Sequence, residues 1–106
     1  MNKISTPTTA ELARFAGLVI GEVMSEGLAS GKHTQGDWNE GAALDPRWHL
    51  FRASRHALDS LGQMDGVSLD KIETAYDHAI RAATRAVMAS YQLSESCGVS
   101  KIPTFR

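Results

Sequence analysis

The stretch DPRWHLFRASRHALDSLG, residues 45–62, decides the fold that the sequence predicts. Asp45 is a favourable helix N-cap, Pro46 suits the first helical position, and Gly62 is a common stop signal. At about 100° per residue, the segment between them has one apolar face and one polar face. The apolar face consists of Leu50, Ala53, Ser54, Ala57, Leu58 and Leu61. We therefore predict an amphipathic helix over residues 46–61.

Two further helices flank this segment. Thr8 and Glu11 have the spacing of a capping box, which predicts the start of a first helix. A short turn with Asp65 and Gly66 at its tip, and Ser68 as the next N-cap, predicts an antiparallel hairpin of the second and third helices. The predicted elements are a first helix over residues 9–29, a glycine-rich connector over 30–44, the second helix, a third helix over 69–92 and a tail over 93–106. No segment alternates like a strand, so we predict a single all-α, three-helix domain with a C-terminal antiparallel helical hairpin.

The apolar periodicity also predicts the core of the hairpin. We expect these side chains to be mostly buried where the two later helices meet: Leu50, Ala57, Leu61, Ile72, Tyr76, Ile80, Ala83 and Val87. Trp38 is the aromatic residue of the connector, and we expect it to pack back onto the helices. In the tail, Ile102 and Phe105 are expected to dock on a neighbouring element.

Small residues mark one face of the first helix. Ala13, Gly17 and Gly21 follow one another at four-residue spacing. Glycine inside a helix costs about 1 kcal/mol relative to alanine, so two glycines one turn apart need a reason. Close approach of another helix, within the fold or across a subunit interface, supplies that reason. We therefore predict a homo-oligomer, at least a dimer, that forms through this helix.

Composition argues against several classes of protein. The 106 residues carry eleven Lys and Arg against twelve Asp and Glu, a formal net charge of −1. Proteins that coat a nucleic-acid duplex are normally basic, so we expect no general DNA binding. No apolar run approaches the roughly 18 residues that span a bilayer, so no membrane partner is expected. The single cysteine, Cys97, allows no intrachain disulfide and fits a reducing compartment, which predicts a cytoplasmic location.

A set of cationic side chains forms the first candidate site. Guanidinium groups bind phosphate oxygens through two parallel hydrogen bonds, and imidazole adds a hydrogen bond or a proton near neutral pH. The candidate ligand-binding residues are Arg52, Arg55, His56, His78, Arg81 and Arg85 on the two later helices, with Lys32 and His33 from the connector. We expect them to line one concave surface that binds a nucleotide or another phosphate-bearing ligand. The alternative is a solvated surface, because Arg55 and Arg81 each have an aspartate at ordinary i,i+4 spacing.

A histidine-ligated metal site is the second candidate. His49 and His56 lie seven residues apart on one helix face. Zinc ligands usually have tighter spacing, and the sequence contains neither an HExxH nor a CxxC motif. We therefore assign no metal ligand and no cofactor.

A carboxylate-bound Mg²⁺ is the third candidate. Glu22 and Glu26 lie one helical turn apart, as do Glu73 and Asp77. Two such pairs on facing helices can hold Mg²⁺ against a triphosphate, as all-helical nucleotide pyrophosphohydrolases do. No partnered nucleophile accompanies these acids, so no catalytic residue is assigned.

A resemblance to a known family connects several of these positions. The positions that carry it are Lys32, His33, Asp37-Trp38, Gly41, Arg55-His56, His78 and Ala82-Ala83. Through these positions the chain resembles, over about residues 23–88, the small phage domain at the N-terminus of dATP/dGTP diphosphohydrolases. Two positions depart from the family pattern: Asp37 replaces an asparagine and Arg81 replaces the family's second histidine. The loss of that histidine weighs against a metal or hydrolytic role and leaves phosphate binding open. The resemblance implies a phage or prophage origin and nucleotide-related biology.

Three functions are consistent with these patterns. The leading hypothesis is a small phage-type helical protein that binds a nucleotide or other phosphate-bearing ligand, with binding preferred over turnover because no complete catalytic set is visible. One alternative is a protein-interaction module, such as a phage inhibitor of a host factor, for example a host defence protein. The other alternative is a Mg²⁺-dependent nucleotide pyrophosphohydrolase, the only case in which a cofactor is expected. If the protein is phage-encoded, the predicted location is the cytoplasm of the host cell.

Overall fold

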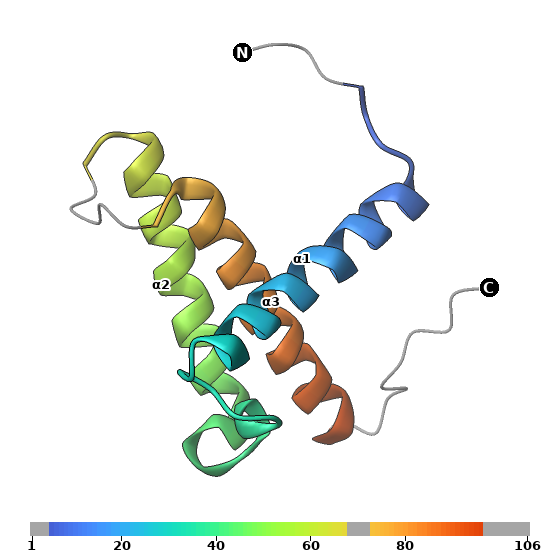
Figure 1. Cartoon of the computed structure of the whole chain (residues 1–106), viewed down its shortest axis with the longest axis vertical. Helices are drawn as coiled ribbons and strands as arrows, with labels where there is room; N and C mark the ends of the chain where they lie inside the picture. The colour runs from blue at the N-terminus through green and yellow to red at the C-terminus, as the bar shows by residue number, and fades with distance from the viewer. Residues whose placement is uncertain (1–4, 68–72, 97–106) are drawn as a thin grey trace.

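Three α-helices make up most of the chain, and the computed structural model describes residues 5–67 and 73–96. The helices are α1 (Thr9–Ala29), α2 (Pro46–Met64) and α3 (Ala75–Ser96). Two short 3₁₀ helices, η1 (Asp37–Asn39) and η2 (Gly41–Leu44), lie in the connector between α1 and α2. No strand occurs within the described ranges. The all-α prediction with a hairpin of α2 and α3 is therefore confirmed, and Figure 1 shows α1 crossing that hairpin.

Local capping signals explain where α1 begins. The Thr8 hydroxyl accepts a hydrogen bond from the Glu11 amide at 3.1 Å, and the Glu11 carboxylate accepts one from the Thr8 amide at 2.8 Å. This reciprocal capping box satisfies two amides that the helix itself leaves unpaired. The predicted bounds of the first helix, 9–29, are confirmed.

A Schellman motif ends α2 later than predicted. Asp45 caps the start, because its carboxylate accepts from the Arg47 amide at 2.9 Å. The helix then continues through Gly62 to Met64, beyond the predicted end at residue 61. Gly66 has a φ of 72° and is the left-handed residue that stops the helix. The Val67 amide donates to the Gly62 carbonyl at 2.9 Å, which closes the motif.

Helix α3 begins later and ends later than predicted. The Thr74 hydroxyl accepts from the Asp77 amide at 3.1 Å, and the Asp77 carboxylate accepts from the Thr74 amide at 2.9 Å, so Thr74 caps a helix that starts at Ala75. The predicted cap, Ser68, lies outside the described residues. The helix runs to Ser96 rather than to residue 92. The rest of the predicted tail, residues 97–106 with the docking positions Ile102 and Phe105, also lies outside the described part.

The seam between α2 and α3 is polar, which corrects the predicted core. The buried side chains of these two helices are His49, Ser60, His78, Ile80, Thr84, Ala89 and Gln92. Of the predicted core residues, only Ile80 is buried, whereas Leu50, Ala57, Leu61, Tyr76, Ala83 and Val87 are exposed and Ile72 lies outside the described residues. The inward face of α2 is offset by one residue, about 100°, from the face that the apolar pattern indicated. The reason is that the polar groups find hydrogen-bond partners across the seam; for example, the Ser60 hydroxyl donates to the Ala75 carbonyl at 2.7 Å.

Helix α1 contributes little buried surface of its own. Val19 is its only buried residue within the described chain. A Cβ atom built on Gly17 or Gly21 would meet no atom within 4 Å, so the close helix contact predicted at these glycines does not form among the described residues. No described helix combines the length and the apolar character needed to cross a membrane.

Candidate functional site

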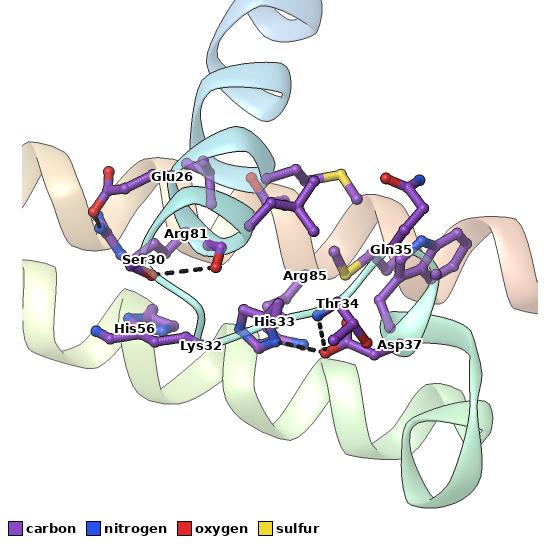
Figure 2. A pocket seen from close by; sticks show the side chains of 18 of the residues that line it. Glu26, Ser30, Lys32, His33, Thr34, Gln35, Asp37, His56, Arg81 and Arg85 are labelled. Atoms are coloured by element: carbon purple, nitrogen blue, oxygen red, sulfur yellow. Dashed lines mark hydrogen bonds and ion pairs between the residues drawn. The ribbon is translucent and has the colours of Figure 1, made fainter.

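A pocket of about 230 Å³ lies where the end of α1 and the connector meet α2 and α3. Its apolar part is formed by Val23, Met24, Leu28, Trp38 and Met88. Its charged and polar wall includes Glu26, Lys32, His33, Asp37, His56, Glu73, Arg81 and Arg85. Figure 2 shows that the Glu26–Arg81 pair and the His33–Asp37 pair occupy different ends of this pocket.

The eight predicted ligand-binding residues do not share one surface. Lys32, His33, His56, Arg81 and Arg85 line the pocket, which agrees with the expected arrangement for five of them. Arg52 instead stacks on the Trp48 ring, with its guanidinium carbon 4.1 Å from the ring centroid. Arg55 is exposed and lies outside the pocket lining. His78 is 2% exposed and lies behind His56. The structure therefore brings five of the eight residues together and places Arg52, Arg55 and His78 outside the pocket lining.

Arg85 is the central cation of the pocket. One of its terminal nitrogens donates to Nδ1 of His49 at 3.2 Å, and its guanidinium carbon lies 5.1 Å from the centroid of the Trp48 ring. Burial lowers the pKa of this guanidinium from its ordinary value. Arg85 forms no direct ion pair with any described carboxylate, although the Asp37 carboxylate attracts it from further away. A half-buried guanidinium without a direct ion pair favours an anionic ligand, because the ligand would offset a desolvated charge.

His49 holds Arg85 in place. The imidazole is fully buried, and its Nε2 lies 2.7 Å from the Trp38 carbonyl oxygen. A carbonyl can only accept and a guanidinium can only donate, so Nε2 must carry the hydrogen and Nδ1 must accept from Arg85. The geometry thus selects the neutral Nε2–H tautomer. Burial lowers the pKa of His49 and the charge of Arg85 adds to the effect, so the neutral ring is favoured.

The connector is anchored on both sides of the pocket. Trp38 is half-buried, with its ring centroid 5.8 Å from that of Tyr91, which confirms that it packs back onto the helices. The side-chain amide of Gln92 donates to the Ala43 carbonyl at 2.7 Å and to the Asn39 side chain at 3.0 Å. These contacts join η1 and η2 to α3 and so set the position of the pocket wall.

A second anchor joins the connector to α1. The His33 amide donates to the Gly27 carbonyl at 3.1 Å, and the His33 imidazole pairs with Asp37 at 3.0 Å. A Cβ atom on Gly27 would come within 2.8 Å of the His33 ring. A larger residue at this position would therefore force the imidazole to move away from α1.

Arg81 is surrounded by carboxylates. Its guanidinium lies 3.1 Å from Glu26, 3.4 Å from Glu73 and 3.9 Å from Asp77. Three of the four acids that the sequence offered for Mg²⁺ thus contact a guanidinium. Arg81 supplies the positive charge at the point where those acids converge.

A group of three potential metal ligands lies beside Arg81. Nδ1 of His56 is 3.1 Å from Nδ1 of His78, and Nδ1 of His78 is 3.3 Å from a carboxylate oxygen of Glu73. Burial lowers the pKa of His56, which outweighs the opposing attraction of the Glu73 carboxylate. Sequence reasoning paired His56 with His49, its neighbour on the same helix, and missed this group. The sequence offered one signal for this group: His56 and His78 lie on the polar faces of the two helices that are predicted to form a hairpin.

No protein-family model, curated protein or solved structure matches this chain.

Proposed function

We propose that this protein binds a small phosphate-bearing ligand, such as a nucleotide, in the pocket between α1, the connector and the α2–α3 hairpin. The observation that carries the proposal is Arg85, a half-buried guanidinium that lines the pocket and forms no direct ion pair with a described carboxylate, although the charge of Asp37 acts on it from further away. His49 accepts only one of its hydrogen bonds, so further N–H groups remain for phosphate oxygens.

The rest of the pocket fits the same class of ligand. Lys32 adds a second cation from the connector, and His33 adds an imidazole. Met24, Met88 and Trp38 also line the pocket and provide polarizable and aromatic surface of the kind on which a nucleobase packs. A phosphate at the cationic wall and a base at the apolar wall would together fill a site of this composition.

A thermal-shift panel tests this proposal. Mono-, di-, tri- and cyclic nucleotides and inorganic phosphate are added to the full chain, and a bound ligand raises the melting temperature by mass action. Arg85→Ala should then weaken binding by about 10–100-fold, because a charge-assisted hydrogen bond contributes about 1.5–3 kcal/mol. Arg55→Ala is the matched control, since it removes the same charge from an exposed position outside the pocket. Arg85→Lys keeps the positive charge but removes the planar set of guanidinium donors, so it shows which of the two the ligand requires.

Two outcomes would contradict it. The first is that neither a nucleotide nor phosphate changes the melting temperature of the wild-type chain. The second is that Arg55→Ala and Arg85→Ala bind the identified ligand equally well. Pyrophosphate release from deoxynucleoside triphosphates in the presence of Mg²⁺ would instead support the pyrophosphohydrolase alternative. That alternative requires Mg²⁺ to displace Arg81 from Glu26 and Glu73.

Exposed apolar side chains support a proposal about assembly. The described part of the chain buries only four hydrophobic residues, Val19, Ala43, Ile80 and Ala89, while Leu12, Phe15 and Leu18 of α1 are at least half exposed. Burying a leucine side chain stabilises a structure by roughly 1.5–3 kcal/mol, so such a surface favours a partner. We propose that a second copy of the chain covers α1.

The same surface is what an interaction module, such as a phage inhibitor of a host protein, would use, and that remains the second candidate function. A cytoplasmic location and the phage origin implied by the resemblance belong to this proposal as well.

A further inference from the structure

We infer that His56, His78 and Glu73 form a binding site for a divalent transition metal, and that Zn²⁺ is the ion that matches their donor atoms best. The three residues come from α2, from α3 and from the segment just before α3. One ligand atom from each lies within 4.8 Å of those of the other two. This inference goes beyond the proposed phosphate binding and does not depend on it.

Two of the three distances between these ligand atoms match the edges of a coordination polyhedron. A tetrahedral Zn²⁺ with bonds of about 2.0–2.1 Å places neighbouring ligand atoms about 3.3–3.4 Å apart. The two Nδ1 atoms of His56 and His78 are 3.1 Å apart, and the Glu73 oxygen is 3.3 Å from Nδ1 of His78. An ion can therefore enter between these atoms with small side-chain adjustments.

Nδ1 of His78 lies between two other potential ligand atoms. Nδ1 of His78 carries at most one hydrogen and faces both Nδ1 of His56 and a carboxylate oxygen of Glu73. A single hydrogen serves only one of these contacts well. A metal ion would accept lone pairs from all three atoms at once, with each imidazole in its neutral Nε2–H tautomer.

The surroundings fit a bound cation. Glu73 also contacts Arg81 through its other carboxylate oxygen at 3.4 Å, which orients the carboxylate as an outer-shell partner does. Three carboxylates, from Glu26, Glu73 and Asp77, surround the single guanidinium of Arg81, so this cluster is net negative before a metal binds. His78 is almost fully buried, which gives the site one rigid ligand.

The donor set selects the kind of metal. Two imidazoles and one carboxylate are the ligands that zinc sites with an open position use, whereas Mg²⁺ and Ca²⁺ require a shell of oxygen ligands. His56 and Glu73 line the pocket, so the remaining coordination position faces it. Water or an oxygen atom of a bound ligand would occupy that position.

Metal titration of the full chain tests the inference. EDTA-treated protein is titrated with ZnCl₂ in a calorimeter and with Co²⁺ under visible absorption, in both cases without any nucleotide or phosphate. We expect one Zn²⁺ per chain and a four-coordinate Co²⁺ spectrum. His56→Ala and Glu73→Gln should each weaken Zn²⁺ binding by at least the 10–100-fold that loss of an outer-shell partner costs. His33→Ala is the control, because this histidine lines the same pocket but pairs with Asp37.

A histidine ¹⁵N spectrum of the wild type keeps the test decisive even where a variant does not fold. Addition of Zn²⁺ should shift Nδ1 of two imidazoles, and circular dichroism reports whether each variant is folded. Unchanged Zn²⁺ affinity in both His56→Ala and Glu73→Gln would overturn the inference, as would loss of binding in His33→Ala alone. Because the titration contains no phosphate ligand, its failure leaves the nucleotide panel unaffected. Failure of that panel likewise leaves the metal titration unaffected.

Discussion

His49 illustrates how a single buried side chain determines the chemistry of its neighbours. The Trp38 carbonyl requires a donor and Arg85 requires an acceptor, and the neutral imidazole supplies both from its two ring nitrogens. A protonated ring would present N–H to the Arg85 guanidinium and lose that hydrogen bond. Burial and the charges of Arg85 and Arg52 act together to lower the pKa of His49, against its hydrogen bonds to carbonyl oxygens.

This arrangement predicts a pH dependence of stability. The pKa of His49 is lower in the folded chain than in the unfolded chain, so the unfolded state binds more protons below the ordinary value of 6.5. The free energy of unfolding should therefore decrease as the pH falls from above 6.5 towards the folded pKa. Urea unfolding at pH 7.5 and pH 5.5 measures this slope.

His49→Gln is the comparison for that measurement. The free energy of unfolding of this variant should change less between the two pH values than that of the wild type. The burial of His56 adds a slope in the same direction, but it is present in both proteins and cancels in the difference. Equal slopes in the two proteins would show that His49 does not titrate as its contacts require.

The connector depends on α3 for its position. Its two 3₁₀ helices have no side-chain caps of their own, and Gln92 supplies donors to the Ala43 carbonyl and to Asn39. Gln92 is buried, and its amide oxygen has no hydrogen-bond partner. Since the nitrogen has several acceptors within reach, the amide is oriented by the connector rather than by its own helix.

Substitutions of Gln92 should therefore release the connector. Gln92→Leu removes both donors and leaves buried acceptors unpaired, which should lower the free energy of unfolding by about 1–3 kcal/mol. Gln92→Glu should cost more, because it keeps the shape but places a carboxylate against those acceptors. Ser90→Ala is the control on the same helix, as its hydroxyl bonds only to its own helix at Ala86. Urea unfolding followed by tryptophan fluorescence measures the stability of each variant. Equal stability of all three variants would contradict the role of Gln92 in holding the connector.

The whole molecule combines a polar interior seam with apolar outer surfaces. Leu58 and Met64 of α2 are each 66% exposed and Leu18 of α1 is 64% exposed, while α2 and α3 bury histidine, serine, threonine and glutamine side chains. Polar seams hold their helices through specific partners, but they gain little from the hydrophobic effect. Self-association would supply the apolar burial that the described part of a single chain lacks.

A dimer through α1 is therefore expected. Light scattering at high micromolar concentration should give twice the mass of the chain. Leu18→Glu should produce the monomer, because it places a charge in the apolar surface of α1. Leu58→Glu makes the same change at a site of similar exposure on α2 and should remain dimeric. A monomeric wild type excludes the proposed dimer, and a monomer from Leu58→Glu alone would move the interface to α2.

Local sequence determined the number of helices, the bounds of α1 and the start of α2. Capping boxes, proline and the turn at Asp65-Gly66 act over a few residues, so their effect is independent of the rest of the chain. The docking of Trp38 was also predictable, because a tryptophan in a polar connector gains from burial. The start of α3 was not, because Thr74–Asp77 and Ser68 offer competing caps and the sequence does not rank them.

Only the tertiary structure decided which face of α2 meets α3. The amphipathic pattern predicts an apolar seam, but polar groups of this seam are satisfied by partners far away in the chain, as in His56–His78 and Ser60–Ala75. Burying such hydrogen-bonded pairs costs little free energy once the two partners lie opposite each other. No local sequence pattern specifies which residues will lie opposite each other. The same long-range packing placed Arg85 in the pocket, left Arg55 outside it, and brought His56, His78 and Glu73 together. The candidate residue types were thus visible in the sequence, whereas their grouping into sites required the fold.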